Sequence, residues 1–307
     1  MKSWLVATVL FFGASGFAPW KNLNDVDPSE KQEILKRDVY SDPTFFPPLY
    51  QAAYDLQQLF EVGGVKATVN FGALLGIARF GQALPWDDDI DYVVTIDQID
   101  KLNALIPLAD KLGHDLFPDD IVRYGVPGDA SVGYKLYRRE PFFVDPETKK
   151  EHWVFVDIFL YQPDEADPEK YVQTREKARK SFPKAWFKKE ELENITFKQC
   201  GPIQRMPCST YTKELLHRSY DKDCEKTARF YFSHHHDVKT CYIWAIKPED
   251  NYPSHKDIKL ENRVEKLLSG MSFAELKESA CKEKQPLLGD EKKPVEEIVS
   301  ALLGDSL

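Results

Sequence analysis

The run Pro85-Trp-Asp-Asp-Asp-Ile-Asp91 contains four aspartates, and the apolar residues 92–94 follow it directly. The β-branched and aromatic residues from Ile90 to Val94 predict a strand. Because alternate residues of a strand share a face, Asp88 is expected to point away from the other three aspartates. The pattern therefore places three carboxylates, those of Asp87, Asp89 and Asp91, on one face.

Three carboxylates on one face repel one another. At about 4 Å and an effective dielectric constant near 20, each pair of charges costs roughly 4 kcal/mol. A divalent cation such as Mg2+ or Mn2+ offsets this repulsion and prefers oxygen ligands. The run thus indicates a metal site. A solvated acidic turn after Pro85 and a calcium loop are the alternatives, although the spacing of an EF-hand loop is absent.

Two glycines and an arginine precede the acidic run. A glycine at the start of a short helix lets a phosphate approach backbone N–H groups, and an arginine further along can pair with phosphate oxygens. We therefore predict that Gly72, Gly76 and Arg79 bind substrate. A packing role is the alternative for the two glycines.

Two further segments predict strands that carry charged residues. In Ser131–Arg139 the alternation places Lys135 on one face and its apolar neighbours on the other, and we predict that Lys135 and Arg138 hold phosphate groups. Surface charge is the alternative for both. In the apolar run 152–161 the single acid Asp157 needs a metal ion or a cationic partner, because an unpaired buried carboxylate is costly.

The spacing of apolar residues predicts the helices and strands that must position these candidate site residues. Leu49–Phe60 predicts a helix that ends at Gly63-Gly64, Val65–Val69 a strand, and Ile96–Leu112 an amphipathic helix closed by Gly113. Residues 163–181 predict a surface connection that becomes helical around Lys170–Arg179.

The runs Phe71-Gly-Ala-Leu-Leu-Gly-Ile-Ala-Arg79 and Leu84-Pro-Trp-Asp-Asp-Asp-Ile-Asp91 together resemble the signature of the LicD and fukutin-related family. Ala73 stands where threonine is usual, which removes one hydroxyl contact to phosphate. A weaker resemblance follows in 203–221, where Asp221 replaces the usual glycine. The resemblance covers roughly residues 50–225.

The resemblance implies an α+β, nucleotidyltransferase-like core: a small mixed β-sheet flanked by helices, to which the sequence adds a C-terminal helical extension. It also implies a metal-dependent transferase. Such enzymes move a phospho-alcohol, such as phosphocholine or ribitol or glycerol phosphate, from a CDP-linked donor onto a glycan or glycoprotein. The alternatives are a catalytically inactive binding protein of the same fold, and a true nucleotidyltransferase that releases pyrophosphate.

The family supplies a further acid from a strand with the pattern of the Asp157 segment. By this resemblance three aspartates of this chain hold Mg2+ or Mn2+. A fourth aspartate is either a further metal ligand or the group that accepts the proton of the acceptor hydroxyl. The metal ligands are Asp89, Asp91 and Asp157, and the fourth acid is Asp87.

The N-terminal residues 1–18 have a basic start, a short apolar stretch and small residues, which predict a signal peptide, with a signal-anchor as the alternative. We therefore expect the secretory pathway, in the ER or Golgi lumen or secreted, with no stable membrane span after cleavage. The sequon at Asn194 agrees with this compartment. The net charge of −9 argues against a nucleic-acid partner.

The five cysteines lie in the C-terminal half, where oxidising conditions would allow disulfides and leave at least one thiol unpaired. A zinc site formed with the histidines 234–236 is the alternative, although its spacing matches no standard template. The expected organisation is a signal peptide at 1–18, a polar arm at 19–48, the LicD-type domain at 49–250 and a charged helical extension at 251–307.

Overall fold

The computed structural model describes residues 20–118, 133–144, 146–147, 149, 151–230, 241–247 and 250–270. The predicted signal peptide, the histidines 234–236, Cys281 and the last 37 residues lie outside these ranges. Within these ranges, no α-helix combines the length and the apolar composition that a membrane span requires.

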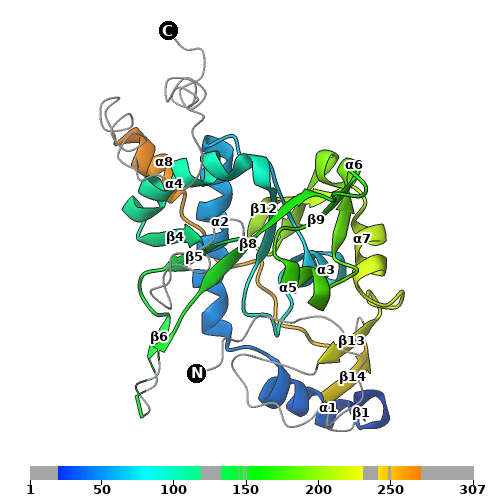
Figure 1. Cartoon of the computed structure of the whole chain (residues 1–307). Coiled ribbons are helices and arrows are strands. Elements are labelled where there is room, and N and C mark those ends of the chain that lie inside the picture. Colours follow the sequence, from blue (N-terminus) through cyan, green and yellow to red (C-terminus); the bar gives the residue numbers. More distant parts are fainter. Residues whose placement is uncertain are drawn as a thin grey trace.

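A seven-stranded mixed sheet forms the centre of the protein (Figure 1). Its strands β3 and β8 run parallel, and the other pairs in this sheet are antiparallel. The first half of β8 pairs with β5 and its last residues pair with β9, so the sheet branches along β8. The strands are β2 (Ala67–Val69), β3 (Asp91–Thr95), β4 (His114–Pro118), β5 (Tyr134–Arg138), β8 (Phe155–Pro163), β9 (Lys170–Gln173) and β10 (Trp186–Lys188).

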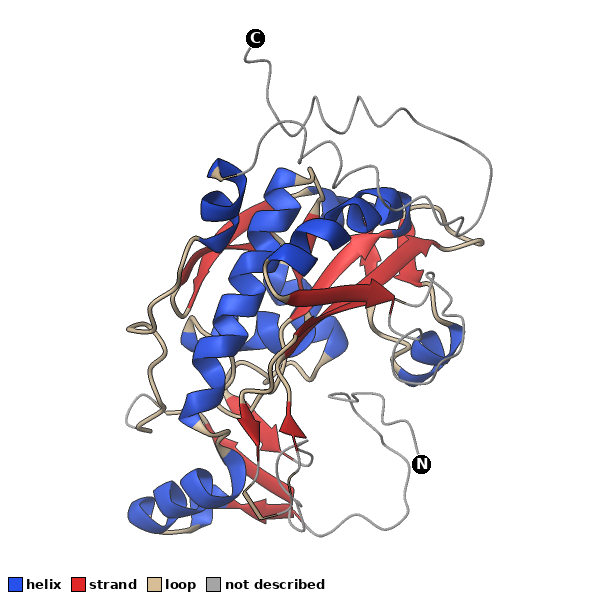
Figure 2. Ribbon diagram, turned by 90° about the vertical axis from the view of Figure 1, so that its left-hand side faces the viewer, coloured by secondary structure: helices blue, strands red, loops and turns tan. Residues whose placement is uncertain are grey.

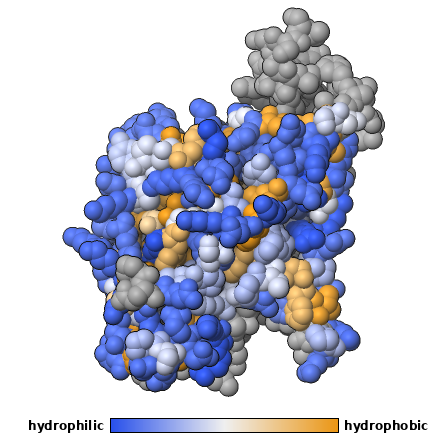
Figure 3. Space-filling model, turned by 180° about the vertical axis from the view of Figure 1, so that it is seen from behind, coloured by the Kyte–Doolittle hydropathy of each residue, from blue (hydrophilic) through white to orange (hydrophobic). Residues whose placement is uncertain are grey.

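One face of this sheet packs against α2 (Phe46–Val62) and α4 (Ile99–Lys111). The apolar residues of α2 recur at helical spacing and are buried, and Phe60 meets Tyr92 of β3 edge to face, with ring centroids 5.4 Å apart. In Figure 1 α2 crosses behind β8. Seen from behind, the molecular surface is mainly hydrophilic, with small apolar patches (Figure 3).

The opposite face is covered over part of its length by α3 (Phe71–Phe80) and by the segment after α5 (Glu176–Ser181). Phe71 lies edge to face on Phe159 of β8, with ring centroids 5.3 Å apart, and Phe182 packs on the same two rings. This small apolar cluster fixes the start of α3 on the sheet.

A second, smaller core lies beside the first (Figure 2). It is built by the three-stranded sheet β1 (Trp20–Asn22), β14 (Cys241–Ala245) and β13 (Thr227–Phe230), together with α1 (Pro28–Ile34). Trp244 is fully buried in it. Among the described residues, the remaining strands form the hairpins β6–β7 (Phe143–Val144, Glu151–His152) and β11–β12 (Ile195–Cys200, Ile203–Ser209). The remaining α-helices there are α6 (Lys189–Glu193), α7 (Thr212–Ser219) and α8 (Arg263–Ser269).

The predicted α+β class is confirmed, as are the helices at 49–60 and 96–112, the second of which begins with a 3₁₀ turn. The helical prediction for Lys170–Arg179 is wrong in its first part. Residues 170–173 form β9, because they pair with the open edge of β8, and only the later residues become helical in α5.

Candidate active site

The aspartates of the acidic run lie in a buried loop that leads into β3. The strand begins only at Asp91, and residues 87–90 are not part of it. The expectation that Asp88 points away from its neighbours is therefore wrong, because the alternation of a strand does not apply to a loop. Carboxylate oxygens of Asp87, Asp88 and Asp89 lie within 4.8 Å of one another, and all three residues are buried.

A second group joins the loop to the central strands. Asp91 opens β3, and Asp157 is its direct neighbour on the parallel strand β8. Carboxylate oxygens of Asp89, Asp91 and Asp157 lie within 4.8 Å of one another, and the Asp157 backbone N–H donates to the Ile90 carbonyl at 3.1 Å. The structure thus brings the three predicted metal ligands into one group, with Asp89 common to both groups.

Burial and mutual repulsion make this group electrostatically costly. The pKa values of Asp89 and Asp91 lie well above the usual range for aspartate. The main cause is burial, and the second is repulsion by the neighbouring carboxylates. Asp89 is only 2% exposed, and its Oδ2 atom is buried without a hydrogen-bond partner among the described residues. A bound cation would relieve both the repulsion and the unmet hydrogen-bonding capacity.

The donor set fits a hard divalent cation. The described residues contain two groups of three side chains able to hold a metal ion, and both consist entirely of aspartates. Carboxylate oxygens suit Mg2+ and Mn2+ rather than zinc, which favours sulfur and nitrogen.

Lys135 supplies a positive charge at the edge of the group. It faces Asp157 across the β5–β8 pair, and its ammonium group donates to Asp157 Oδ1. The same ammonium nitrogen lies 4.6 Å from the centroid of the Phe155 ring. Lys135 is therefore a cationic partner of the kind expected for Asp157.

Gly72 lies in the first turn of α3, directly against the acidic loop. A Cβ atom at this position would collide with Asp87 Oδ2, so glycine is what lets the carboxylate approach the helix. The preceding Asn70 does not cap the helix with its side chain, and Phe71 adopts a left-handed φ of 47°. A non-glycine residue in this conformation is uncommon and is typical of strained functional sites.

Gly76 has a different environment. A Cβ atom there would lie 2.5 Å from the Gln82 carbonyl oxygen and 2.7 Å from the Leu84 backbone nitrogen. The structure therefore places Gly76 against the backbone that follows α3, which is the packing role named as its alternative.

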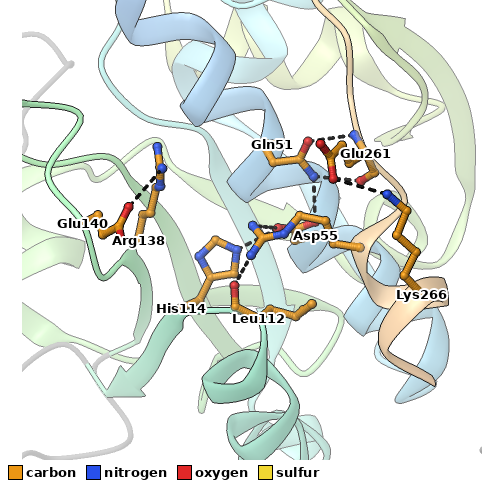
Figure 4. A network of polar contacts seen from close by, with 9 residues as sticks. Gln51, Asp55, Leu112, His114, Arg138, Glu140, Glu261 and Lys266 are labelled. Atoms are coloured by element: carbon orange, nitrogen blue, oxygen red, sulfur yellow. Dashed lines mark hydrogen bonds and ion pairs between the residues drawn. The ribbon is translucent and has the colours of Figure 1, made fainter. Parts of the chain in front are cut away.

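The structure does not bring the two predicted arginines to the acids. Arg79 lies seven residues after Gly72 on α3, about 10 Å along the helix, and donates to the carbonyls of Cys224 and Thr227 at 2.7 and 2.8 Å. Arg138 lies on the face of β5 opposite Lys135 and makes an exposed ion pair with Glu140 at 3.6 Å (Figure 4).

Residues far away in the sequence hold the acidic loop, and sequence reasoning missed them. Ser41 donates through its hydroxyl to the Asp87 carbonyl at 3.2 Å, and its backbone N–H donates to the Pro85 carbonyl at 2.9 Å. The loop residue Trp86 packs edge to face against Trp244, with ring centroids 5.2 Å apart. No local pattern marks Ser41 or Trp244 as partners of the loop.

The four described cysteines, Cys200, Cys208, Cys224 and Cys241, are buried free thiols. The structure thus shows no disulfide among them, and Cys281 lies outside the described residues. Burial raises the pKa of the Cys208 thiol to about 12 and also raises that of Cys200, so both stay neutral.

The comparisons with known proteins agree with this geometry. Residues 64–201 match the sequence model of the family described as LicD/FKTN/FKRP, nucleotidyltransferase domain. None of the curated proteins compared with this chain matches it. The matched residues include α3, the acidic loop, Lys135 and Asp157. Residues 64–201 therefore have the sequence features of the nucleotidyltransferase-fold domain of the LicD, fukutin and fukutin-related family.

Proposed function

We propose that this protein is a metal-dependent transferase that moves a phospho-alcohol from a CDP-linked donor onto a glycan or glycoprotein acceptor. The match to the family over residues 64–201 supports a transferase of this type. The single observation that carries the proposal is the buried group formed by Asp89, Asp91 and Asp157.

In this proposal Asp89, Asp91 and Asp157 hold Mg2+ or Mn2+, with Asp87 as a further ligand or as acceptor of the hydroxyl proton. When bound, such a cation neutralises the negative charge that develops on the leaving nucleotide. The orphaned Oδ2 atom of Asp89 and the raised pKa values of Asp89 and Asp91 support this assignment.

The protein's own residues would bind and orient the phosphates. The start of α3, whose N-cap residue Asn70 makes no side-chain hydrogen bond to the helix, lies beside Asp87, and a helix N-terminus attracts anions. Lys135, already seated beside Asp157, can pair with phosphate oxygens of the donor. The acceptor hydroxyl would then be deprotonated at the acid cluster, with Asp87 as the group that accepts its proton.

We also propose that the protein works in the secretory pathway, in the ER or Golgi lumen or outside the cell. The apolar N-terminal stretch supports this, and Asn194 of the sequon is exposed directly after α6. Enzymatic removal of N-linked glycans from protein made in a secretory host tests the proposal by a shift in mass, which Asn194→Gln should abolish.

Thermal unfolding tests the reaction class. The protein is titrated with CDP-choline, CDP-ribitol and CDP-glycerol, each with and without Mn2+. A ligand at a hundredfold excess over its dissociation constant stabilises the folded state by about 2.7 kcal/mol. We expect a Mn2+-dependent rise in melting temperature with one donor, and none with Asp89→Asn, which keeps the side-chain shape but lacks the charge.

The released product then separates the proposal from nucleotide transfer. Release of CMP in the presence of acceptor supports transfer of the phospho-alcohol, whereas release of pyrophosphate from CTP would assign a true nucleotidyltransferase. A cooperatively folded protein that responds to none of the three CDP-linked donors with Mn2+ would contradict the proposed transfer.

A further inference from the structure

Three aromatic rings lie in a row across the strands β4, β5 and β8 of the central sheet. Phe117 of β4 stacks on Tyr137 of β5, with ring centroids 5.4 Å apart and planes 12° from parallel. Tyr137 in turn meets Phe155 of β8, with centroids 5.6 Å apart. All three side chains are half-buried. We call these residues the aromatic row.

The strand register places the aromatic row on the same face as the acids. Tyr137 pairs with Phe155 and Lys135 pairs with Asp157, and residues two apart on a strand share a face. Phe117 pairs with Lys135 across β4 and β5, so it shares that face as well. The row therefore extends from the acid group along one side of the sheet.

The aromatic row is not needed for the main hydrophobic core. The residues that alternate with it, Tyr134, Leu136 and Val156, are buried against the helices on the other face. None of the three rings of the row belongs to that core or packs against it as a partly buried member. Large rings that remain half-exposed beside a charged site are typical of ligand contacts.

Lys135 joins the row to the acid group. Its ammonium group donates to Asp157 and lies 4.6 Å from the centre of the Phe155 ring. A ligand whose phosphates bind at Lys135 and the acids would thus have the first ring of the row beside its next chemical group. The further rings follow at steps of 5.6 and 5.4 Å.

We propose that the aromatic row is the subsite for the pyrimidine base of the nucleotide donor, which stacks on one or two of its rings. This inference rests on the proposed function, because it takes the ligand to be a nucleotide with its phosphates at the acid group. Stacking suits a base, since its flat π-face needs no further hydrogen bonds to bind a ring. The charges of the site determine how the nucleotide is oriented: its anionic phosphates lie at Lys135 and its base lies on the aromatic row.

Two ligands that differ only in the base test the subsite. Equilibrium binding of CMP and of ribose 5-phosphate is measured calorimetrically in the presence of Mn2+, for the wild type and for Tyr137→Leu and Phe155→Leu. We expect the wild type to prefer CMP by about five- to hundredfold, the range that base stacking supplies. The leucine variants should lose most of this preference and bind ribose 5-phosphate as the wild type does.

Conservative and remote variants separate stacking from folding. Tyr137→Phe keeps the ring and should keep the preference for CMP. Phe143→Leu removes an equally large ring that is 47% exposed on β6, outside the row, and should change nothing. Melting temperatures and Mn2+ binding of all variants confirm that the fold and the acid group are intact.

The outcomes distinguish this inference from the function on which it rests. If the wild type prefers CMP and both leucine variants retain the preference, the base binds elsewhere and the inference is wrong while the function stands. Equal weakening of both ligands would assign the row to a sugar ring and would also overturn it. A wild type that binds neither ligand with Mn2+ would contradict the proposed function and the subsite together.

Discussion

At the scale of single residues, the site depends on how closely the backbone lets the aspartate carboxylates approach one another and the start of α3. Asp87 can lie on the first turn of α3 only because residue 72 has no side chain. Asp91 and Asp157 are held side by side by the register of two parallel strands, which gives them no freedom to separate. These constraints keep the carboxylates together despite their repulsion, which is what a preorganised cation site requires.

Replacement of Gly72 by alanine should weaken Mn2+ binding without lowering the stability of the fold. Alanine favours a helix over glycine by about 1 kcal/mol, so the free energy of unfolding should stay level or rise. The added methyl group would displace the Asp87 carboxylate, and we expect Mn2+ affinity to fall severalfold. Calorimetric Mn2+ titration and thermal unfolding measure the two effects.

Gly76→Ala is the matched comparison on the same helix. Its Cβ atom would meet backbone rather than a movable carboxylate, so this variant should lose stability. If Gly72→Ala binds Mn2+ as the wild type does, Asp87 and the first turn of α3 take no part in the cation site.

At the scale of elements, the acidic loop is clamped by segments outside the matched domain. Gln82, just before the loop, donates to the Pro253 carbonyl at 2.6 Å and accepts from the His255 backbone N–H at 3.0 Å. His255 itself is buried, stacks on Phe46 and pairs with the Tyr50 hydroxyl at 3.0 Å. The segment 250–262 therefore ties the loop to α2.

Loss of the Gln82 side chain should loosen this clamp. Gln82→Ala leaves the partly buried Pro253 carbonyl and the buried His255 N–H without their partners, and each loss costs at most about 1–3 kcal/mol. We expect a lower melting temperature and weaker Mn2+ binding, because the acidic loop starts five residues later. Gln204→Ala, an exposed glutamine on β12, serves as the control. Unchanged Mn2+ affinity in Gln82→Ala would show that the clamp stabilises the fold alone.

His255 should make stability depend on pH. Burial lowers the pKa of His255 to about 4 in the folded protein, against 6.5 as its ordinary value. Between these values the unfolded chain binds a proton that the folded protein does not. The contribution of His255 to stability is therefore full above pH 6.5 and is lost as the pH falls towards 4, by up to about 3 kcal/mol.

Denaturant unfolding of the wild type and of His255→Gln between pH 4 and 8 measures this contribution. The difference in pH dependence between the two proteins isolates His255 from the carboxylates that titrate in the same range. Parallel curves for the two proteins would contradict a buried neutral histidine at this position.

At the scale of the whole molecule, the segment that leads into α8 is anchored on the sheet face opposite the acids. Asp55 of α2 is fully buried and binds His114 at 2.8 Å and Arg263 at 2.9 Å, and Gln51 joins Asp55 to Glu261 (Figure 4). Arg263 also donates to the Leu112 carbonyl. One network thus connects α2, the end of α4, β4 and α8.

Arg263→Met should affect stability without affecting the site. Removal of the guanidinium takes the Arg263 partner away from the buried Asp55, and because Arg263 is partly exposed we expect a loss of about 1–3 kcal/mol. Mn2+ and CMP binding should not change, since the network lies behind the sheet. Arg205→Met, an exposed arginine stacked on Phe197, is the control for the loss of an arginine.

The test compares urea unfolding and Mn2+ titration of both variants with the wild type. An Arg263→Met protein as stable as the wild type would mean that the network does not anchor this segment. A loss of Mn2+ affinity at equal stability would instead couple the two faces of the sheet.

Local patterns in the sequence determined the α+β class, the main helices and the residue types of the acid group. Apolar periodicity identifies α2 and α4, because each helix must bury one face, and the family signature includes Gly72 and the acidic run. The isolated acid in an apolar strand indicated that Asp157 needs a cationic partner, since a buried charge demands compensation. These features depend on neighbours in the chain and are therefore visible in it.

Only the tertiary structure decided which charges meet. Asp88 joins the acids because the chain forms a loop before β3, and Lys135 rather than Arg138 reaches Asp157 because of the strand register. The partners of the acidic loop, Ser41 and Trp244, come from opposite ends of the chain. Such contacts depend on packing between distant segments, and no local spacing encodes them.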